Sequence, residues 1–156
     1  MTLEIGQLAP DFSLPSDGEE ITLSEFKGKN IVLYFYPKDD TPGCTIEAQD
    51  FTKRIAEFHK LGSVVFGLSK DSINSHCKFV EKYKLGFNLL SDVKGEVCEA
   101  YGVIAEKSMF GKKYLGIDRS TFLIDKLGKI VKIWRSVKVN GHVDEVLEAV
   151  KKLQKS

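Results

Sequence analysis

Ile31-Val-Leu-Tyr-Phe-Tyr36 is a run of six successive apolar or aromatic residues that Pro37 brings to an end. A continuous run of this length predicts a β-strand that is covered on both faces, as in the centre of an α/β sheet. The residues that follow, from Pro37 to Gly43, predict a loop. The loop therefore separates this buried strand from Cys44.

A helix is predicted directly after this loop. Starting at Cys44, apolar residues recur at spacings of four, three, four and three, and Gly62 supplies a stop; these residues are Ala48, Phe51, Ile55 and Phe58. Thr41 is expected to be the N-cap, and Pro42 suits the first helical position. Cys44 should therefore lie in the first turn of this helix.

The rest of the chain alternates predicted strands with predicted helices. An N-terminal hairpin is expected at 12–14 and 21–23, later strands at 64–68, 88–90, 120–124 and 130–134, and helices within 73–84, 93–101 and 143–153. Strands separated by helices pair in parallel, whereas the late hairpin adds antiparallel strands. We therefore expect one α/β domain over 1–156 with a mixed central sheet flanked by helices.

The charge distribution argues against several classes of partner. The chain has 23 Lys and Arg against 22 Asp and Glu, and no segment concentrates one sign. A basic stripe for nucleic acid or a membrane surface is therefore not expected. The start lacks a basic segment followed by a long apolar one, and no apolar run approaches the ~20 residues of a spanning helix. We expect a cytoplasmic protein.

Three cysteines, Cys44, Cys77 and Cys98, fit neither a zinc knuckle nor a disulfide framework, so they are expected to be thiols. A metal site made from His76, Cys77 and Cys98 would have too few ligands. The histidines are interpreted as solvated helix residues; they are His59, His76 and His142. We therefore expect no metal site.

Of the three cysteines, Cys44 has the predicted position that most favours a reactive thiol. Unpaired N–H groups and the helix dipole favour a thiolate in a first helical turn. Complete ionisation raises the reactive fraction by only roughly 30-fold, about 2 kcal/mol, so other groups must contribute. Thr41 is one helical turn before the sulfur, Arg119 offers a permanent charge, and Pro37 can shield the sulfur from water.

Each of these residues also has a simpler interpretation. Cys44 lies on the apolar stripe of its helix and would then be a small core residue. Thr41 would be an N-cap alone, and Arg119 would form an ordinary surface ion pair. Spacing does not decide between the two sets of roles.

The segment Pro37-x-x-x-Thr41-x-x-Cys44 resembles the active-site signature of peroxiredoxins. The longer string Tyr36-Pro-Lys-Asp-Asp-Thr-Pro-Gly-Cys-Thr-Ile-Glu-Ala48 is similar to the bacterioferritin comigratory protein subfamily, also called PrxQ. Further similar segments span nearly the whole chain: Ala9-Pro-Asp-Phe12, Leu89-Leu-Ser-Asp92, Glu106-Lys-Ser108 and the segment 116–125.

The resemblance implies a thioredoxin-like fold with an N-terminal hairpin. It also implies reduction of hydrogen peroxide and organic hydroperoxides without metal or flavin, thioredoxin or a similar thiol as electron donor, and a role in antioxidant defence. Cys44 corresponds to the peroxidatic cysteine, and Pro37, Thr41 and Arg119 correspond to the residues that shape its pocket. Members of this subfamily are often monomers, and a monomer is expected.

The sequence departs from the family at the second, resolving cysteine. Many members carry it five residues after the first, where this chain has Gln49, and others carry it near Val80. Cys77 is one turn before Val80, so we hypothesise that it forms a disulfide with oxidised Cys44 after local unwinding. Otherwise Cys77 is a structural thiol, as Cys98 is expected to be, and an external thiol reduces Cys44 directly.

Two other functions use the same cysteine. A peroxide-sensing redox-switch protein would oxidise Cys44 with little turnover. A thiol-disulfide oxidoreductase normally needs a Cys-x-x-Cys pair, but Glu47 occupies the second position.

Overall fold

The predicted strand at 31–36 is the central strand of the main sheet. In the computed structural model, which describes residues 3–155, the strand order is β5-β4-β3-β8-β9. These strands are β3 (Asn30–Phe35), β4 (Ser63–Ser69), β5 (Asn88–Ser91), β8 (Ser120–Ile124) and β9 (Ile130–Trp134). β3, β4 and β5 pair in parallel, whereas β8 is antiparallel to both β3 and β9. The prediction of a mixed sheet is confirmed.

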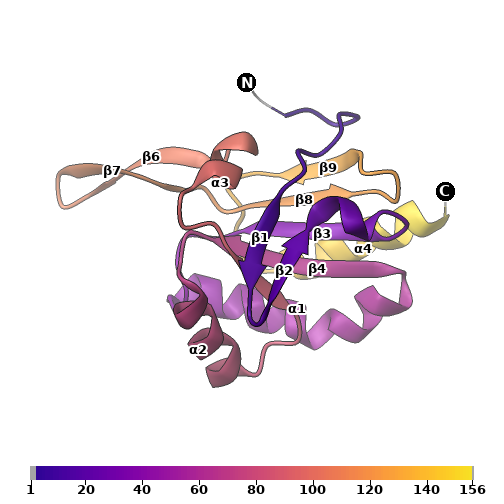
Figure 1. Cartoon of the computed structure of the whole chain (residues 1–156), viewed down its shortest axis with the longest axis horizontal. Helices are drawn as coiled ribbons and strands as arrows, with labels where there is room; N and C mark the ends of the chain where they lie inside the picture. The colour runs from indigo at the N-terminus through magenta and orange to yellow at the C-terminus, as the bar shows by residue number, and fades with distance from the viewer. Residues whose placement is uncertain (1–2, 156) are drawn as a thin grey trace.

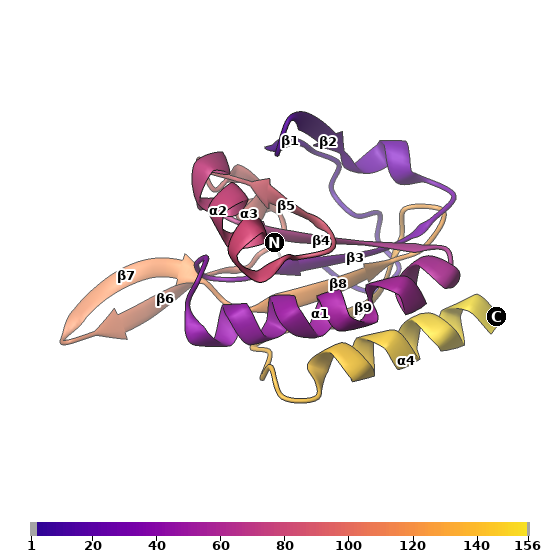
Figure 2. The same ribbon diagram turned by 90° about the horizontal axis from the view of Figure 1, so that it is seen from below.

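Alternate residues of β3 supply two separate cores, which is why its sequence is continuously apolar. Ile31, Leu33 and Phe35 lie in one core cluster, and Val32 and Tyr34 lie in the other. Figure 2 shows that α1 (Pro42–Lys60) and α4 (His142–Lys155) cover one face of the sheet.

The smaller elements lie on the other side of the sheet and at its β5 edge. The predicted N-terminal hairpin is confirmed as β1 (Ser13–Ser16) and β2 (Glu19–Thr22), followed by the 3-10 helix η1 (Leu23–Phe26). α2 (Ile73–Tyr83) packs beside β5, and α3 (Glu96–Ala100) is shorter than the predicted segment 93–101 (Figure 1). Within residues 3–155, no helix is both long enough and apolar enough to cross a membrane.

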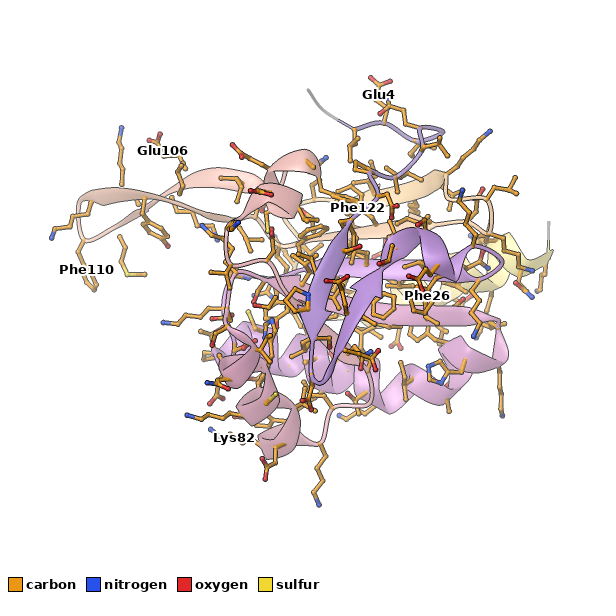
Figure 3. All side chains as sticks on the ribbon, in the orientation of Figure 1. Glu4, Phe26, Lys82, Glu106, Phe110 and Phe122 are labelled. Carbon is orange, nitrogen blue, oxygen red and sulfur yellow. The ribbon has the colours of Figure 1, made fainter. Side chains whose placement is uncertain are left out.

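A second hairpin was not predicted from the sequence. β6 (Ile104–Met109) and β7 (Lys112–Ile117) pair in antiparallel and project from the body of the molecule (Figure 1). Phe110 at its tip is 98% exposed and points into solvent, whereas Phe122 lies inside the molecule (Figure 3). Because both sides of the hairpin tip face water, its residues show no alternation that a pattern could detect.

The interpretation of His142 as a solvated residue is wrong. His142 is 4% exposed, and its Nε2 lies 2.8 Å from the hydroxyl oxygen of Thr121 in β8. It is four residues before Val146, so it lies on the apolar face that α4 presents to the sheet. Burial lowers the pKa of His142 to about 4. His59, in contrast, is exposed as predicted.

Candidate active site

Sheet pairing brings Arg119 next to the start of α1. Phe35, the last residue of β3, pairs with Ser120, the first residue of β8. Because the strands are antiparallel, the residue before β8 lies beside the loop that leaves β3. That loop leads into α1, so Arg119 meets Cys44 although the two are 75 residues apart.

The Arg119 guanidinium bridges two residues on successive turns of α1. Its Nη2 lies 3.4 Å from the Sγ of Cys44, and its Nη1 donates to the Oε1 of Glu47 at 2.7 Å. Cys44 is 1% exposed and the Arg119 side chain is 16% exposed. Burial would lower the pKa of Arg119, but Glu47 and Cys44 together raise it, so the guanidinium stays charged. The predicted pair of Cys44 and Arg119 is thus in contact.

Gly43 gives the guanidinium room to lie against the first turn of α1. A Cβ built at Gly43 would lie 3.1 Å from the Nη2 of Arg119. A side chain at this position would therefore push the guanidinium away from Cys44. The approach of Arg119 depends on a residue that the sequence analysis treated only as part of the loop.

Glu47 belongs to this group and was missed as a site residue. It is completely buried, and its Oε2 has no hydrogen-bond partner among the described residues. Burial raises the pKa of Glu47 to about 7, although the charge of Arg119 opposes the rise. A signal was present, because Glu47 is three residues after Cys44 and next to Ala48 on an otherwise apolar stripe.

Glu47→Gln is expected to change how stability depends on pH. The folded state favours the neutral carboxyl, so this contribution is complete below the ordinary pKa of 4.5 and is lost as the pH rises through about 7. Between about pH 4.5 and pH 8 the stability of the parent should fall relative to the variant by on the order of 3 kcal/mol. Urea unfolding of both proteins measures this difference. The matched control is Glu57→Gln, a half-exposed glutamate of the same helix that also pairs with an arginine; a constant difference between parent and Glu47→Gln would contradict the prediction.

Thr41 occupies the predicted N-cap position, but its side chain does not cap the helix. Its hydroxyl donates to the carbonyl oxygen of Lys38 at 2.8 Å, and no cap hydrogen bond is formed. The hydroxyl hydrogen is therefore used within the loop, and the oxygen keeps its capacity to accept. Pro42 is in the first turn of α1 as predicted, and Pro37 is half-buried at the start of the loop.

Comparison with known proteins shows the family to which the chain belongs. A model of the AhpC/TSA family matches residues 5–133. The chain is 55% identical to a putative peroxiredoxin bcp of Coxiella burnetii, over 94% of this chain and 98% of that protein. The chain belongs to the peroxiredoxin family. Peroxiredoxin Bcp of Bacillus subtilis is also 55% identical, over 97% of both chains.

Solved structures confirm the fold of this peroxiredoxin as thioredoxin-like. Peroxiredoxin Q of Xanthomonas campestris superimposes with a TM-score of 0.88 at 46% identity, covering 92% of this chain and 91% of that one. A mutant of PrxQ from Xylella fastidiosa gives a TM-score of 0.92 at 39% identity, covering 97% and 98%. Peroxiredoxins are thiol-dependent peroxidases, so this chain is an enzyme that reduces peroxides at the expense of a thiol.

The other two cysteines of this peroxiredoxin lie in different surroundings. Cys98 is completely buried in α3, and burial, with Asp92 nearby, raises its pKa well above the ordinary value. Cys77 is half-buried in α2, and burial together with the Asp17 carboxylate raises the pKa of its thiol. All three cysteines are free thiols in this structure. Asp17 belongs to the turn between β1 and β2, so the Cys77 thiol faces that turn.

Asp17→Asn is expected to make Cys77 react faster with an alkylating reagent. The substitution removes a negative charge beside the thiol, so it should lower the pKa of Cys77 and enlarge its thiolate fraction at neutral pH. Alkylation of the reduced protein, followed by peptide mass spectrometry, measures each cysteine separately. Cys98 in the same sample is the internal control, and an unchanged rate at Cys77 would contradict the expectation.

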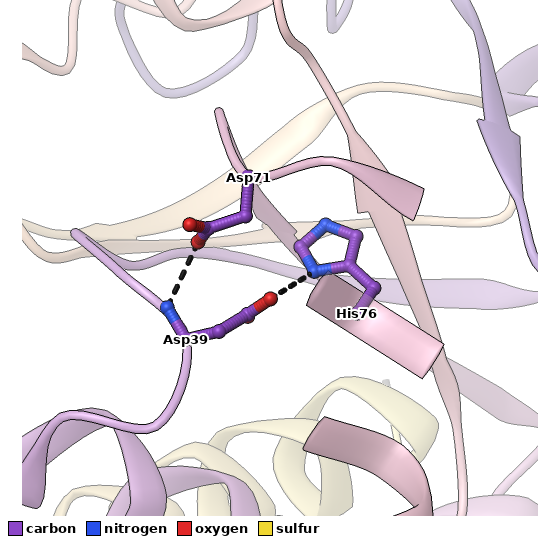
Figure 4. A group of neighbouring side chains, drawn as sticks. All are labelled: Asp39, Asp71 and His76. Carbon is purple, nitrogen blue, oxygen red and sulfur yellow. Dashed lines mark hydrogen bonds and ion pairs between the residues drawn. The ribbon is translucent and has the colours of Figure 1, made fainter. Parts of the chain in front are cut away.

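The interpretation of His76 as a solvated residue is also wrong. His76 is 3% exposed, because it lies on the face of α2 that also buries Phe79. Its Nδ1 lies 2.7 Å from the Oδ2 of Asp39, and the main-chain N–H of Asp39 donates to the Oδ2 of Asp71 at 2.8 Å (Figure 4). Asp39 was not predicted as part of any site, because nothing in its spacing links it to a helix that begins 34 residues later.

Asp39, Asp71 and His76 are the one group within residues 3–155 whose side chains are close enough together to hold a metal ion. The group contains neither Cys77 nor Cys98, which were considered as ligands with His76. Asp39 Oδ2 already contacts His76 Nδ1, and Asp71 Oδ2 already accepts from the main-chain N–H of Asp39 and from the Ser69 hydroxyl; Figure 4 shows the two contacts among the three residues. A metal would have to replace these hydrogen bonds.

Proposed function

We propose that Cys44 is the peroxidatic cysteine of this enzyme. Its thiolate attacks one oxygen of the peroxide, so that an S–O bond forms while the O–O bond breaks. The sulfur becomes a sulfenic acid, and the leaving oxygen takes up a proton to become water or an alcohol. The contact that supports the proposal most strongly is the 3.4 Å approach of the Arg119 Nη2 to the Cys44 Sγ.

Four further residues complete this reaction site: Arg119, Glu47, Thr41 and Pro37. The Arg119 charge stabilises both the thiolate and the negative charge that develops on the leaving oxygen. Glu47 is a positioning residue, since its 2.7 Å ion pair holds Nη1 of the guanidinium while Nη2 contacts the sulfur. The Thr41 hydroxyl oxygen accepts a hydrogen bond from the incoming peroxide, because its own hydrogen is used by Lys38. Pro37 limits access of water to the sulfur.

Hydrogen peroxide and organic hydroperoxides are the proposed substrates. The structure of the bacterioferritin comigratory protein of Xanthomonas campestris is described in connection with alkyl peroxide reduction activity, and it matches this chain with a TM-score of 0.87 at 46% identity. We propose antioxidant defence in the cytoplasm as the role of the enzyme, working as a monomer.

We propose that Cys77 resolves the oxidised Cys44. Its sulfur attacks the sulfenic sulfur, a disulfide forms, and water leaves; thioredoxin or a similar thiol then reduces the disulfide. Support comes from the half-buried position of Cys77, because Cys98 is fully enclosed. Non-reducing mass spectrometry after one equivalent of peroxide tests the step. Absence of a Cys44–Cys77 species would leave the one-cysteine cycle.

A turnover assay separates the enzyme from a peroxide-sensing switch. Peroxide consumption is followed with thioredoxin, thioredoxin reductase and NADPH in large excess over the protein. Many peroxide molecules reduced per protein chain support the proposal. Consumption that stops after one equivalent would instead support the switch, in which oxidised Cys44 changes the affinity for a partner.

A further inference from the structure

Two adjacent aspartates of the active-site loop contact opposite ends of α2. Asp39 bonds to the first turn of the helix, at Ser75 and His76, whereas Asp40 bonds to its last turn. This loop leads into the first turn of α1, which carries Cys44, and α2 carries Cys77 between the two contacts. The loop and the helix are therefore fastened to each other on both sides of the proposed resolving cysteine.

The Asp39 contact is buried and uses both oxygens of the carboxylate. Its Oδ1 accepts from the Tyr36 hydroxyl at 2.5 Å, and its Oδ2 accepts from the Ser75 hydroxyl at 2.7 Å and contacts the Nδ1 of His76 at 2.7 Å. The Nε2 of His76 donates to the carbonyl oxygen of Leu90 at 2.9 Å. Asp39 and His76 thus join the end of β3, α2 and β5.

The main chain of the loop is held at the same residue. Asp71, two residues before the start of α2, accepts the N–H of Asp39 at 2.8 Å and the Ser69 hydroxyl at 2.7 Å. Figure 4 shows Asp71 and His76 reaching Asp39 from two directions. Movement of α2 away from the loop would therefore break several hydrogen bonds to a charged group, each of which is stronger than a neutral one.

The Asp40 contact is exposed to solvent. Its carboxylate bonds to Lys82 at 2.8 Å and to the Tyr83 hydroxyl at 2.7 Å, and its side chain is 43% exposed. Figure 3 shows Lys82 on the outside of α2. Water can replace these partners, so this contact restrains the helix far less than the buried one does.

Cys77 does not face the same side of α2 as this buried contact. His76 and Phe79 are buried towards the sheet, whereas the Cys77 thiol lies beside Asp17 of the N-terminal hairpin. Cys44 is buried in the cluster that includes Phe79. For the two sulfurs to meet, the first half of α2 has to unwind or turn, and the Asp39 contacts oppose that movement.

We propose that Asp39, with Ser75 and His76, is a latch that sets how often α2 opens. The proposal rests on the roles proposed above for Cys44 and Cys77. Opening permits the sulfenic acid and the Cys77 thiol to form a disulfide and water. A closed latch leaves the sulfenic acid exposed to a second peroxide, which oxidises it to a sulfinic acid and is itself reduced to water or an alcohol. Asp39 is thus a positioning residue that controls the competition between resolution and overoxidation.

Hydrogen exchange of the reduced protein tests the latch without any peroxide. In Asp39→Asn, amides of α2 should exchange about 10- to 100-fold faster, the equivalent of one hydrogen bond to a charged group. Amides of β3 and α4 should not change. Asp40→Asn is the matched control, because it removes the neighbouring carboxylate that bonds to the same helix, and α2 should then exchange nearly as in the parent.

Ser75→Ala distinguishes the effect of the latch on hydrogen exchange from the effect of helix propensity in α2. Alanine favours a helix more than serine does, so propensity alone would slow exchange in α2. The latch predicts faster exchange, because Asp39 loses one of its donors. Slower or unchanged exchange in both Ser75→Ala and Asp39→Asn overturns the proposal, as does an equal acceleration throughout the chain, which would indicate global destabilisation.

The competition itself is measured after adding peroxide in steps. Mass spectrometry gives the ratio of Cys44–Cys77 disulfide to Cys44 sulfinic acid, and this ratio should rise in Asp39→Asn by a factor similar to that of the exchange rate. If the ratio of disulfide to sulfinic acid stays unchanged although the amides of α2 exchange faster, the proposal that Asp39 controls overoxidation is wrong. A failure of Cys44 as peroxidatic residue is recognised separately, because exchange and oxidation of Cys44 are observed independently.

Discussion

Replacing Cys44 with serine is expected to abolish peroxide consumption and leave the fold intact. A serine hydroxyl is neither ionised at neutral pH nor oxidised by peroxide, so no sulfenic acid forms. The two side chains have nearly the same shape, and Cys44 is 1% exposed with Arg119 as its polar contact. The substitution therefore removes the reacting atom with little change in packing.

The test compares the three single cysteine-to-serine variants in the thioredoxin-coupled assay. Cys98→Ser is the matched control, because it changes a completely buried cysteine outside the site and should keep the turnover of the parent. Cys77→Ser should still form the sulfenic acid but should be overoxidised more readily. Circular dichroism checks the fold of each variant. If Cys44→Ser consumed peroxide at the parent rate, the proposed site would be wrong.

Replacing Arg119 with alanine is expected to slow oxidation of Cys44 by about 10²- to 10³-fold, the effect of losing one preorganised donor at a developing charge. Loss of thiolate alone accounts for at most roughly 30-fold. The larger expected effect arises because, in the proposed reaction, the guanidinium also stabilises the negative charge on the leaving oxygen. Arg119→Lys should recover only part of the rate, since one ammonium cannot bond to both Cys44 and Glu47 in the same planar geometry.

Stopped-flow oxidation of the reduced protein over a range of pH measures the rate and the thiolate fraction together. Arg54→Ala is the control, because Arg54 forms ion pairs on the exposed surface of α1. The double variant Arg119→Ala with Glu47→Gln is a second control, because Arg119→Ala alone leaves the buried Glu47 carboxyl without its partner. A rate loss explained entirely by the smaller thiolate fraction would show that Arg119 does not stabilise the leaving oxygen.

The sequence patterns predicted the elements that are periodic. The continuous run at 31–36, the apolar stripe from Cys44 to Phe58 and the late hairpin are all present, because each is specified by neighbouring residues. The hairpin β6–β7 was not predicted, since its projecting tip faces water on both sides. His76 and His142 were misread because residue type was given more weight than their position on apolar helix faces.

The residues of the candidate site also fall into two groups, those that are close together in the sequence and those that packing brings together. Cys44, Thr41 and Pro37 belong to one short segment, so the sequence by itself placed them together at a strand-loop-helix junction. The contact with Arg119 arises only from the antiparallel pairing of β3 and β8. The burial of Glu47 and the contacts of Asp39 with α2 likewise depend on packing between distant segments.

The amino-acid sequence therefore specifies the local features of the site: the strand, the loop, the helix start and the thiol that they carry. Packing between distant segments brings Arg119 to that thiol, brings Glu47 to Arg119, and joins Asp39 of the loop to the helix that carries Cys77. The physical reason is that periodicity reports which face of an element is buried, but not which other element covers it.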